Sequence, residues 1–256
     1  MSDMMLARRL FACIDNTTLN ATDNDATVEA FCRRTRELTL DDGTHVAAVC
    51  VYPRFVDVAR RTLEGSGIRV ASVAGAFPHG QLPTGLKVKE VRYAVAQGAD
   101  EVDVVLSRGL LLAGEDNAVR DEVAALKEAC GTSRLKVILE TGELPSPTLV
   151  ERASQLAIDG GADFIKTSTG KIAVGATLDA AESMLNVVKR NVKKYKKTIG
   201  FKAAGGISTP EEAVAYAEKA KKIMGEDYIN NQTFRIGASR LTECLHAFLT
   251  FQSAAN

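Results

Sequence analysis

The chain has 256 residues with 32 basic and 32 acidic side chains, so its formal net charge is zero. This length suits one α/β barrel or two small domains. The balanced charge argues against nucleic-acid and anionic-membrane partners, which favour basic surfaces. The sequence contains no run of 18 apolar residues, so no transmembrane helix is predicted. It also shows no signal-peptide core near the N-terminus.

Short runs rich in Val and Ile alternate with helical patterns along the whole chain, which is typical of buried parallel strands joined by helices. The predicted strands are 10–15, 45–52, 69–77, 101–107, 135–141, 163–167, 199–202 and 234–238. Helix starts are clearest at Ser146-Pro147 and at Thr209-Pro210-Glu211-Glu212, where a capping residue precedes a proline. Eight such units without a linker predict an α/β fold, a single (β/α)8 TIM barrel over residues 1–256. A short N-terminal extension (about 1–8) and a C-terminal tail (about 251–256) would flank it.

The cysteines and histidines give no sign of a metal site. The five cysteines are odd in number and show no Cys-x-x-Cys spacing, which is typical of reduced thiols in a cytoplasmic protein. The three histidines are scattered along the chain and lack metal-ligand spacing. We therefore expect a cytoplasmic protein with no bound metal.

A lysine stands near the end of the predicted strand 163–167, where a buried strand normally carries an aliphatic side chain. Lys166 precedes Thr-Ser-Thr-Gly170, and Lys202 precedes Ala-Ala-Gly-Gly206. Burial lowers the pKa of a lysine and makes it an amine nucleophile. Two such lysines before glycine-containing turns indicate Schiff-base chemistry on a phosphorylated carbonyl compound. The alternative is a surface lysine that packs its stem and keeps its ammonium in water.

A short repeat places an acid in the same position as the first lysine. Gly98-Ala-Asp-Glu-Val-Asp103 matches Gly161-Ala-Asp-Phe-Ile-Lys166, so Asp103 and Lys166 have the same offset in predicted strands 4 and 6. Alternate strands of a barrel share interior layers, and catalytic groups lie at the C-terminal strand ends. The two side chains are therefore predicted to enter the barrel mouth at similar depth.

Long motifs follow one another in order over about residues 9–245. They are Ile14-Asp15-Asn-Thr-Thr-Leu19, Cys50-Val-Tyr-Pro-Arg54, Phe77-Pro-His-Gly80, Glu101-Val-Asp103-Val, Ile138-Leu-Glu-Thr-Gly142, Phe164-Ile-Lys-Thr-Ser-Thr-Gly170, Phe201-Lys202-Ala-Ala-Gly-Gly206 and Arg235-Ile-Gly-Ala-Ser239. This set resembles the motifs of the deoxyribose-phosphate aldolases. The resemblance implies a class I aldolase without a cofactor, acting in deoxyribonucleoside catabolism. It would reversibly cleave 2-deoxy-D-ribose 5-phosphate to D-glyceraldehyde 3-phosphate and acetaldehyde.

The resemblance also implies a role for each matching residue. Lys166 corresponds to the lysine that forms the Schiff base. Lys202 corresponds to the second active-site lysine, whose charge disfavours protonation of the first. Asp103 corresponds to the carboxylate that transfers protons through water, and Asp15 to a supporting group. Cys50 is a further supporting candidate, and its residue type favours a packed thiol over a nucleophile.

The phosphate site implied by the resemblance follows predicted strands 6 to 8. Its members are Gly170, Gly205, Gly206, Gly237 and Ser239. Backbone N–H groups at glycine turns and helix N-termini bind phosphate in this part of a barrel, and Lys171 would add a cation. The chain departs from the family where Arg240 replaces a common second serine. Arg240 could grip phosphate or face solvent. The last residues, 252–256, also lack the C-terminal tyrosine of some members.

Other functions remain open on the same pattern. An isomerase or epimerase would abstract a proton with a carboxylate, a histidine or a metal and would form no covalent lysine adduct. A non-catalytic barrel would only bind a phosphosugar, and a zinc-dependent aldolase is disfavoured by the few histidines. The basic run 189–197 lies over an apolar helical stripe, which indicates a solvated helix face rather than a nucleic-acid site. The expected partners are small phosphosugar and aldehyde substrates, and a homodimer is left open.

Overall fold

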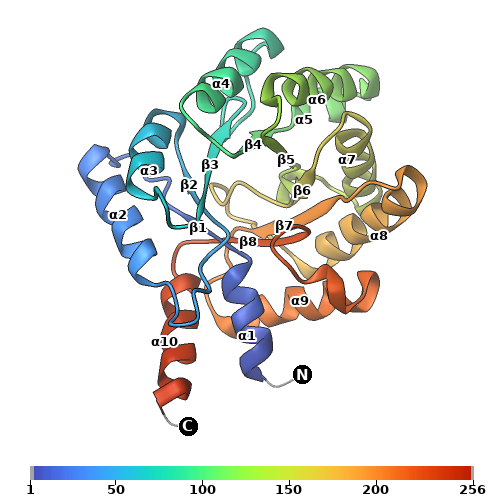
Figure 1. The fold of residues 1–256 in the computed structure, drawn as a ribbon. Coiled ribbons are helices and arrows are strands. Elements are labelled where there is room, and N and C mark those ends of the chain that lie inside the picture. Colours follow the sequence, from blue (N-terminus) through green and yellow to red (C-terminus); the bar gives the residue numbers. More distant parts are fainter. Residues whose placement is uncertain (1–2, 255–256) are drawn as a thin grey trace.

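The computed structural model describes residues 3–254 and contains eight parallel strands that close into a barrel in chain order. The strands are β1 (Ile14–Thr17), β2 (Ala48–Val51), β3 (Arg69–Ala74), β4 (Glu101–Val105), β5 (Arg134–Ile138), β6 (Phe164–Lys166), β7 (Gly200–Ala204) and β8 (Phe234–Ala238). Strand β1 pairs with both β2 and β8, which closes the ring. The predicted (β/α)8 TIM barrel is confirmed (Figure 1).

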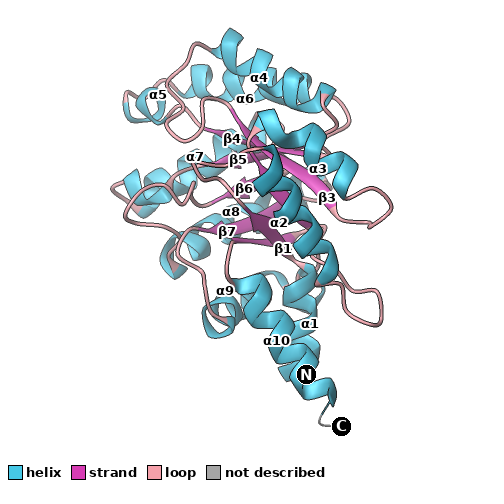
Figure 2. Ribbon diagram, turned by 90° about the vertical axis from the view of Figure 1, so that its left-hand side faces the viewer, coloured by secondary structure: helices cyan, strands magenta, loops and turns pink. Residues whose placement is uncertain are grey.

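Helices surround the strands on the outside, as Figure 2 shows. They are α1 (Asp3–Ala12), α2 (Asp25–Glu37), α3 (Val56–Thr62), α4 (Thr84–Ala96), α5 (Arg108–Leu112), α6 (Asp116–Cys130), α7 (Pro147–Asp159), α8 (Leu178–Tyr195), α9 (Pro210–Met224) and α10 (Leu241–Ala254). Both predicted helix starts are confirmed. Ser146 caps α7 by accepting from Leu149 N, and Thr209 forms a capping box with Glu212 at α9. Among the described residues, no helix is long and apolar enough to cross a membrane.

The first predicted strand, 10–15, is wrong at its N-terminal end. Leu10 and Phe11 belong to helix α1, and strand β1 begins only at Ile14. Ala7, Leu10 and Phe11 are buried with the helical spacing i, i+3, i+4, and α1 packs against α10 and α9. Figure 1 shows α1 and α10 together below the barrel. A short apolar run does not by itself distinguish a buried strand from the end of a helix, and here packing decided for the helix. The other seven predicted strands overlap the observed ones.

Alternate side chains of each strand point into the barrel or out toward the helices. Outward residues such as Val102, Val104 and Val137 belong to the large apolar core beneath the helices. The inward residues of β2 and β3 form a separate small apolar cluster with Leu19. Its strand members are Ala48, Cys50, Ala71 and Val73. The inward positions of the other strands are the ones that carry charged side chains.

Candidate active site

Seven charged side chains meet inside the barrel, and none is more than 3% exposed. They are Asp15 from β1, Glu101 and Asp103 from β4, Lys136 from β5, Lys166 from β6, Lys202 from β7 and Arg235 from β8. Buried charges are stable only when they are paired and hydrogen-bonded. We refer to these seven residues as the charged cluster.

Asp103 joins the two lysines that the sequence singled out. Its Oδ2 atom lies 2.8 Å from Lys166 Nζ and 2.8 Å from Lys202 Nζ. Lys202 Nζ also lies 2.5 Å from Asp15 Oδ2. The prediction that Asp103 and Lys166 reach similar depth is therefore confirmed. The structure brings Lys166, Lys202, Asp103 and Asp15 into one hydrogen-bonded group.

Three members of the charged cluster received no role from the sequence. Lys136 Nζ lies 2.8 Å from Asp103 Oδ1 and 2.6 Å from Glu101 Oε2. Arg235 donates to Glu101 at 2.7 Å and also pairs with Asp15. The sequence signal that marked Lys166, a cation within an apolar strand, is also present at Lys136 in strand β5. The strand register places Lys136 beside Asp103.

Lys166 is the lysine of the charged cluster whose neutral form is the most favoured. If all seven groups were ionised, four cations would face three anions, and a neutral Lys166 restores balance. Burial is the main influence that lowers the pKa of Lys166; Asp103 opposes it and the Lys202 charge adds to it. Burial would also lower the pKa of Lys202 and Lys136, but the carboxylates beside them prevail and raise both values. Lys166 is thus the lysine of this cluster best suited to act as a nucleophile.

The two aspartates of the cluster stay ionised despite their burial. Burial would raise the pKa of Asp103, but Lys136, Lys166 and Lys202 outweigh it and hold that pKa well below the usual value. Asp15 behaves in the same way, and there Lys202 is the strongest of the cations that lower the pKa. An ionised Asp103 beside Lys166 can accept a proton.

Cys50 borders the charged cluster from the apolar side of the barrel interior. Its side chain is fully buried on β2 among Ala48, Ala71 and Val73. Burial, with a contribution from the Asp103 charge, raises the pKa of the Cys50 thiol to about 11. A protonated thiol is a poor nucleophile, so this position supports the packed-thiol interpretation.

A cavity of about 410 Å³ opens at the C-terminal ends of β6, β7, β8 and β1, and Lys166 lies in its wall. The cavity is lined by Thr17, Leu19, Asn20, Lys166, Thr169, Gly170, Lys171, Ala204, Gly205, Gly206, Ile207, Ser208, Gly237, Ala238, Ser239 and Arg240. All five predicted phosphate residues are among them, together with the cations Lys171 and Arg240. The cavity is not lined by Asp103, Lys202 or Asp15. These residues lie behind Lys166, which contacts Asp103.

Close backbone packing shapes this cavity and explains a glycine in its wall. Gly205 has φ +90°, and a Cβ there would lie 3.0 Å from Gly175 Cα and 3.4 Å from Gly170 Cα. Only glycine accepts such a conformation at so little steric cost. The sequence did not single out Thr17, Thr169 or Ser208, whose polar side chains also line the cavity.

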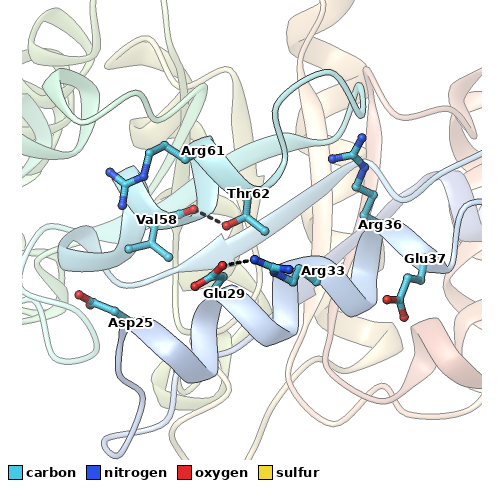
Figure 3. A pocket seen from close by; sticks show the side chains of 8 residues that line it. All are labelled: Asp25, Glu29, Arg33, Arg36, Glu37, Val58, Arg61 and Thr62. Carbon is cyan, nitrogen blue, oxygen red and sulfur yellow. Dashed lines mark hydrogen bonds and ion pairs between the residues drawn. The ribbon is translucent and has the colours of Figure 1, made fainter.

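A larger hollow of about 650 Å³ lies outside the barrel, between α2 and α3 (Figure 3). Most of its charged residues are exposed, and Arg33 pairs with Glu29 at 2.5 Å. Exposed ion pairs of this kind are screened by water and contribute little. The hollow offers no buried nucleophile, so we place the candidate active site at the mouth of the barrel. Within residues 3–254, no group of three or more His, Cys, Asp or Glu side chains is arranged to hold a metal ion.

Comparisons with known proteins identify a family and several solved structures that this chain resembles. The model of the DeoC/LacD family aldolases matches residues 9–241. A solved structure of the aldolase QR15 is 30% identical with TM-score 0.79, covering 96% of this chain and 99% of that one. A Coccidioides immitis protein with a provisional assignment as deoxyribose-phosphate aldolase is 27% identical with TM-score 0.81, covering 94% and 86%. The tetrameric deoxyribose phosphate aldolase of Aeropyrum pernix, 23% identical with TM-score 0.76 over 97% of each chain, shares the fold.

Proposed function

This chain belongs to the DeoC/LacD aldolase family, and we propose that it is a class I aldolase that acts on 2-deoxy-D-ribose 5-phosphate. The reaction would reversibly yield D-glyceraldehyde 3-phosphate and acetaldehyde. The observation that carries the proposal is the position of Lys166. It is a buried lysine with a lowered pKa, and it links the mouth cavity to a cluster whose charges balance when it is neutral.

The proposed reaction begins when the free amine of Lys166 attacks the C1 aldehyde of the open-chain sugar. Loss of water gives an iminium, which draws electrons from the C2–C3 bond. The C3 hydroxyl gives up its proton, the C2–C3 bond breaks, and D-glyceraldehyde 3-phosphate leaves. The enamine on Lys166 then takes a proton at C2, and hydrolysis of the new iminium releases acetaldehyde and the amine.

The neighbours of Lys166 would supply the charge and the proton transfers. Asp103 is ionised and lies 2.8 Å from Lys166 Nζ, so through a bridging water it can take a proton from the C3 hydroxyl and return one to the enamine. Lys202 would act as the adjacent cation that disfavours protonation of Lys166. Asp15 would hold Lys202 in place through their 2.5 Å ion pair.

The phosphate would occupy the part of the cavity formed by the turns after β6, β7 and β8. Gly170, Gly205, Gly206 and Gly237 would present backbone N–H groups there, and Ser239 a hydroxyl. Lys171 would add positive charge. Binding energy from this remote group helps to orient C1 against the amine, so the phosphorylated sugar should react faster than 2-deoxyribose.

Trapping of the covalent intermediate tests the proposal. Treatment with acetaldehyde and borohydride, followed by peptide mass spectrometry, should place an ethyl group on Lys166. Lys166→Arg should give no adduct, because guanidinium stays protonated. An isomerase or a non-catalytic barrel would give no substrate-dependent adduct, and full labelling elsewhere with Lys166 unmodified would contradict the assignment. Prolonged chelator treatment should leave turnover intact, whereas loss restored by zinc would indicate class II chemistry.

A further inference from the structure

The segment between β6 and α8 forms much of the cavity wall and contains no helix or strand over residues 167–177. It supplies Thr169, Gly170 and Lys171 to the lining. A loop of this length without secondary structure depends on contacts from neighbouring segments to hold one conformation. The shape of the proposed phosphate site therefore depends on whatever fixes this loop.

A buried side-chain contact to the loop comes from Glu140, two residues beyond the end of β5. The side chain of Glu140 is fully buried, and its carboxylate oxygens accept from Thr169 N at 3.1 Å and from Thr169 Oγ1 at 2.5 Å. Thr169 Oγ1 in turn accepts from Lys171 N at 3.1 Å. Hydrogen bonds to a carboxylate are stronger than neutral ones. One side chain thus fixes the backbone on both sides of Gly170.

The backbone of Glu140 is itself strained in a way that serves this contact. Its dihedral angles are φ 55° and ψ 60°, the left-handed region that residues other than glycine rarely adopt. Such strain persists only where surrounding contacts determine the conformation, and it clusters at functional sites. Here the left-handed residue precedes the turn that follows β5, and its carboxylate contacts Thr169.

Two further contacts hold the loop beyond Thr169. A Cβ at Gly142 would overlap the carbonyl oxygen of Val174, so the turn after Glu140 packs closely on the loop. Ala176 N donates to Gly205 O at 3.0 Å, which docks the far end of the loop on the turn after β7. The loop is therefore held from the β5 side at Thr169 and Val174, and from the turn after β7 at Ala176.

We propose that Glu140 is a positioning residue that sets the geometry of the phosphate side of the cavity through Thr169. Glu140 does not line the cavity, so it acts on substrate only by holding the loop. This inference rests on the proposed phosphate-ester substrate. It assigns Glu140 to recognition of the phosphate and not to the chemistry at Lys166.

The test compares Glu140→Gln and Thr169→Val with the unmodified protein on 2-deoxyribose 5-phosphate and on 2-deoxyribose. Glutamine keeps the size of the side chain but cannot accept from both the N–H and the hydroxyl of Thr169. We expect KM for the phosphorylated sugar and the inhibition constant of inorganic phosphate to rise roughly 10-fold, the size of one charge-assisted hydrogen bond. The loss in kcat/KM on 2-deoxyribose should be clearly smaller. The double variant should lose little more than Thr169→Val alone, because that variant already removes the hydroxyl contact with Glu140.

Glu122 provides a matched control. It is also a buried glutamate, and it accepts from the backbone N of Ser107 at 3.2 Å and from Ser107 Oγ at 2.9 Å, beyond the neighbouring strand β4. Its carboxylate also pairs with Lys87 Nζ at 3.0 Å and does not line the cavity. Glu122→Gln should lower the melting temperature while leaving the ratio of kcat/KM for the two sugars unchanged.

Two results would overturn the inference. Equal losses of Glu140→Gln on both sugars would make Glu140 a structural residue only. Tighter binding of inorganic phosphate would mean that the carboxylate acts mainly as a repelling charge. If the unmodified protein itself showed no preference for the phosphorylated sugar and did not bind inorganic phosphate, the proposed function would fail instead, which separates the two questions.

Discussion

The two sides of the barrel interior differ sharply in polarity. Strands β2 and β3 present small apolar side chains, with Cys50 at the border, whereas β1 and β4 to β8 present the charged cluster. Barrel interiors are normally filled by branched apolar residues, so the charged side is the departure. Cys50 lies close enough to the charged side that the charges of Asp103, Lys202 and Lys166 all influence the pKa of its thiol.

Chemically identical lysines of the charged cluster have pKa values that are shifted in opposite directions. Lys136 and Lys202 each contact at least two carboxylates, whereas the ion pair of Lys166 is with Asp103 alone, an aspartate that the other two lysines also contact. The apolar side adds no dipoles that would stabilise a third ammonium. The carboxylates beside each lysine therefore determine its role, and its residue type alone does not.

The largest effect on cleavage is expected when the buried lysines are replaced one at a time. Lys166→Ala should reduce cleavage to background and abolish trapping by borohydride, because no other amine in the cluster has a lowered pKa. Lys136→Met should still give the adduct on Lys166, although the loss of a buried ion pair should lower the free energy of unfolding by about 3–5 kcal/mol. Denaturant unfolding and peptide mass spectrometry measure both effects. An adduct on Lys136 in the unmodified protein would contradict the assignment of Lys166 as the nucleophile.

A large effect on pH dependence is expected for Lys202→Leu. The Lys202 charge lowers the pKa of Lys166, so its removal should raise that pKa and leave less free amine near neutral pH. In a plot of kcat/KM against pH, the ascending limb should move to higher pH, and the rate should recover as the pH rises. Each unit of pKa shift corresponds to about 1.4 kcal/mol between the two protonation states of Lys166. An unmoved limb with a lower plateau would show instead that Lys202 positions substrate or transfers protons.

An intermediate effect should follow when the apolar side is made charged. Cys50→Asp would place a carboxylate near Lys166, favour the ammonium, and move the ascending limb of kcat/KM to higher pH. Cys50→Asn has the same size without the charge and should leave the limb in place. Cys50→Ala should retain turnover and cost about 1 kcal/mol of stability, the price of a small cavity. Identical pH profiles for the Asp and Asn variants would show that the apolar side does not influence Lys166.

The smallest effect is expected at Arg240, which lines the rim of the cavity and is exposed. Arg240→Ser should raise KM for the phosphorylated sugar by about threefold, because an exposed charge is screened by solvent and salt. The KM of the variant should also depend less on ionic strength. If neither KM nor its salt dependence changed, Arg240 would simply face solvent.

Much of the site could be predicted because its signals are local in the chain. Glycine turns after apolar strands mark the cavity wall, and the repeated offset of Asp103 and Lys166 predicted that they reach similar depth. Their contact at 2.8 Å agrees with that prediction. The ion pairs that complete the cluster could not be found in this way, since Asp15 and Arg235 are 220 residues apart in the chain. The contact between Glu140 and Thr169 could not be predicted either, because a glutamate in the left-handed conformation has no sequence signature of its own.

The sequence by itself determined the barrel and the candidate nucleophile, because strand periodicity, helix caps and a cation in an apolar strand are read from neighbouring residues. Tertiary structure alone decided that residues 3–12 form a helix, that Lys136 and Arg235 join the cluster, and that Lys166 is the lysine with the lowered pKa. The physical reason is that burial and charge pairing depend on which strands become neighbours. Only closure of the barrel brings three carboxylates and four cations to one point.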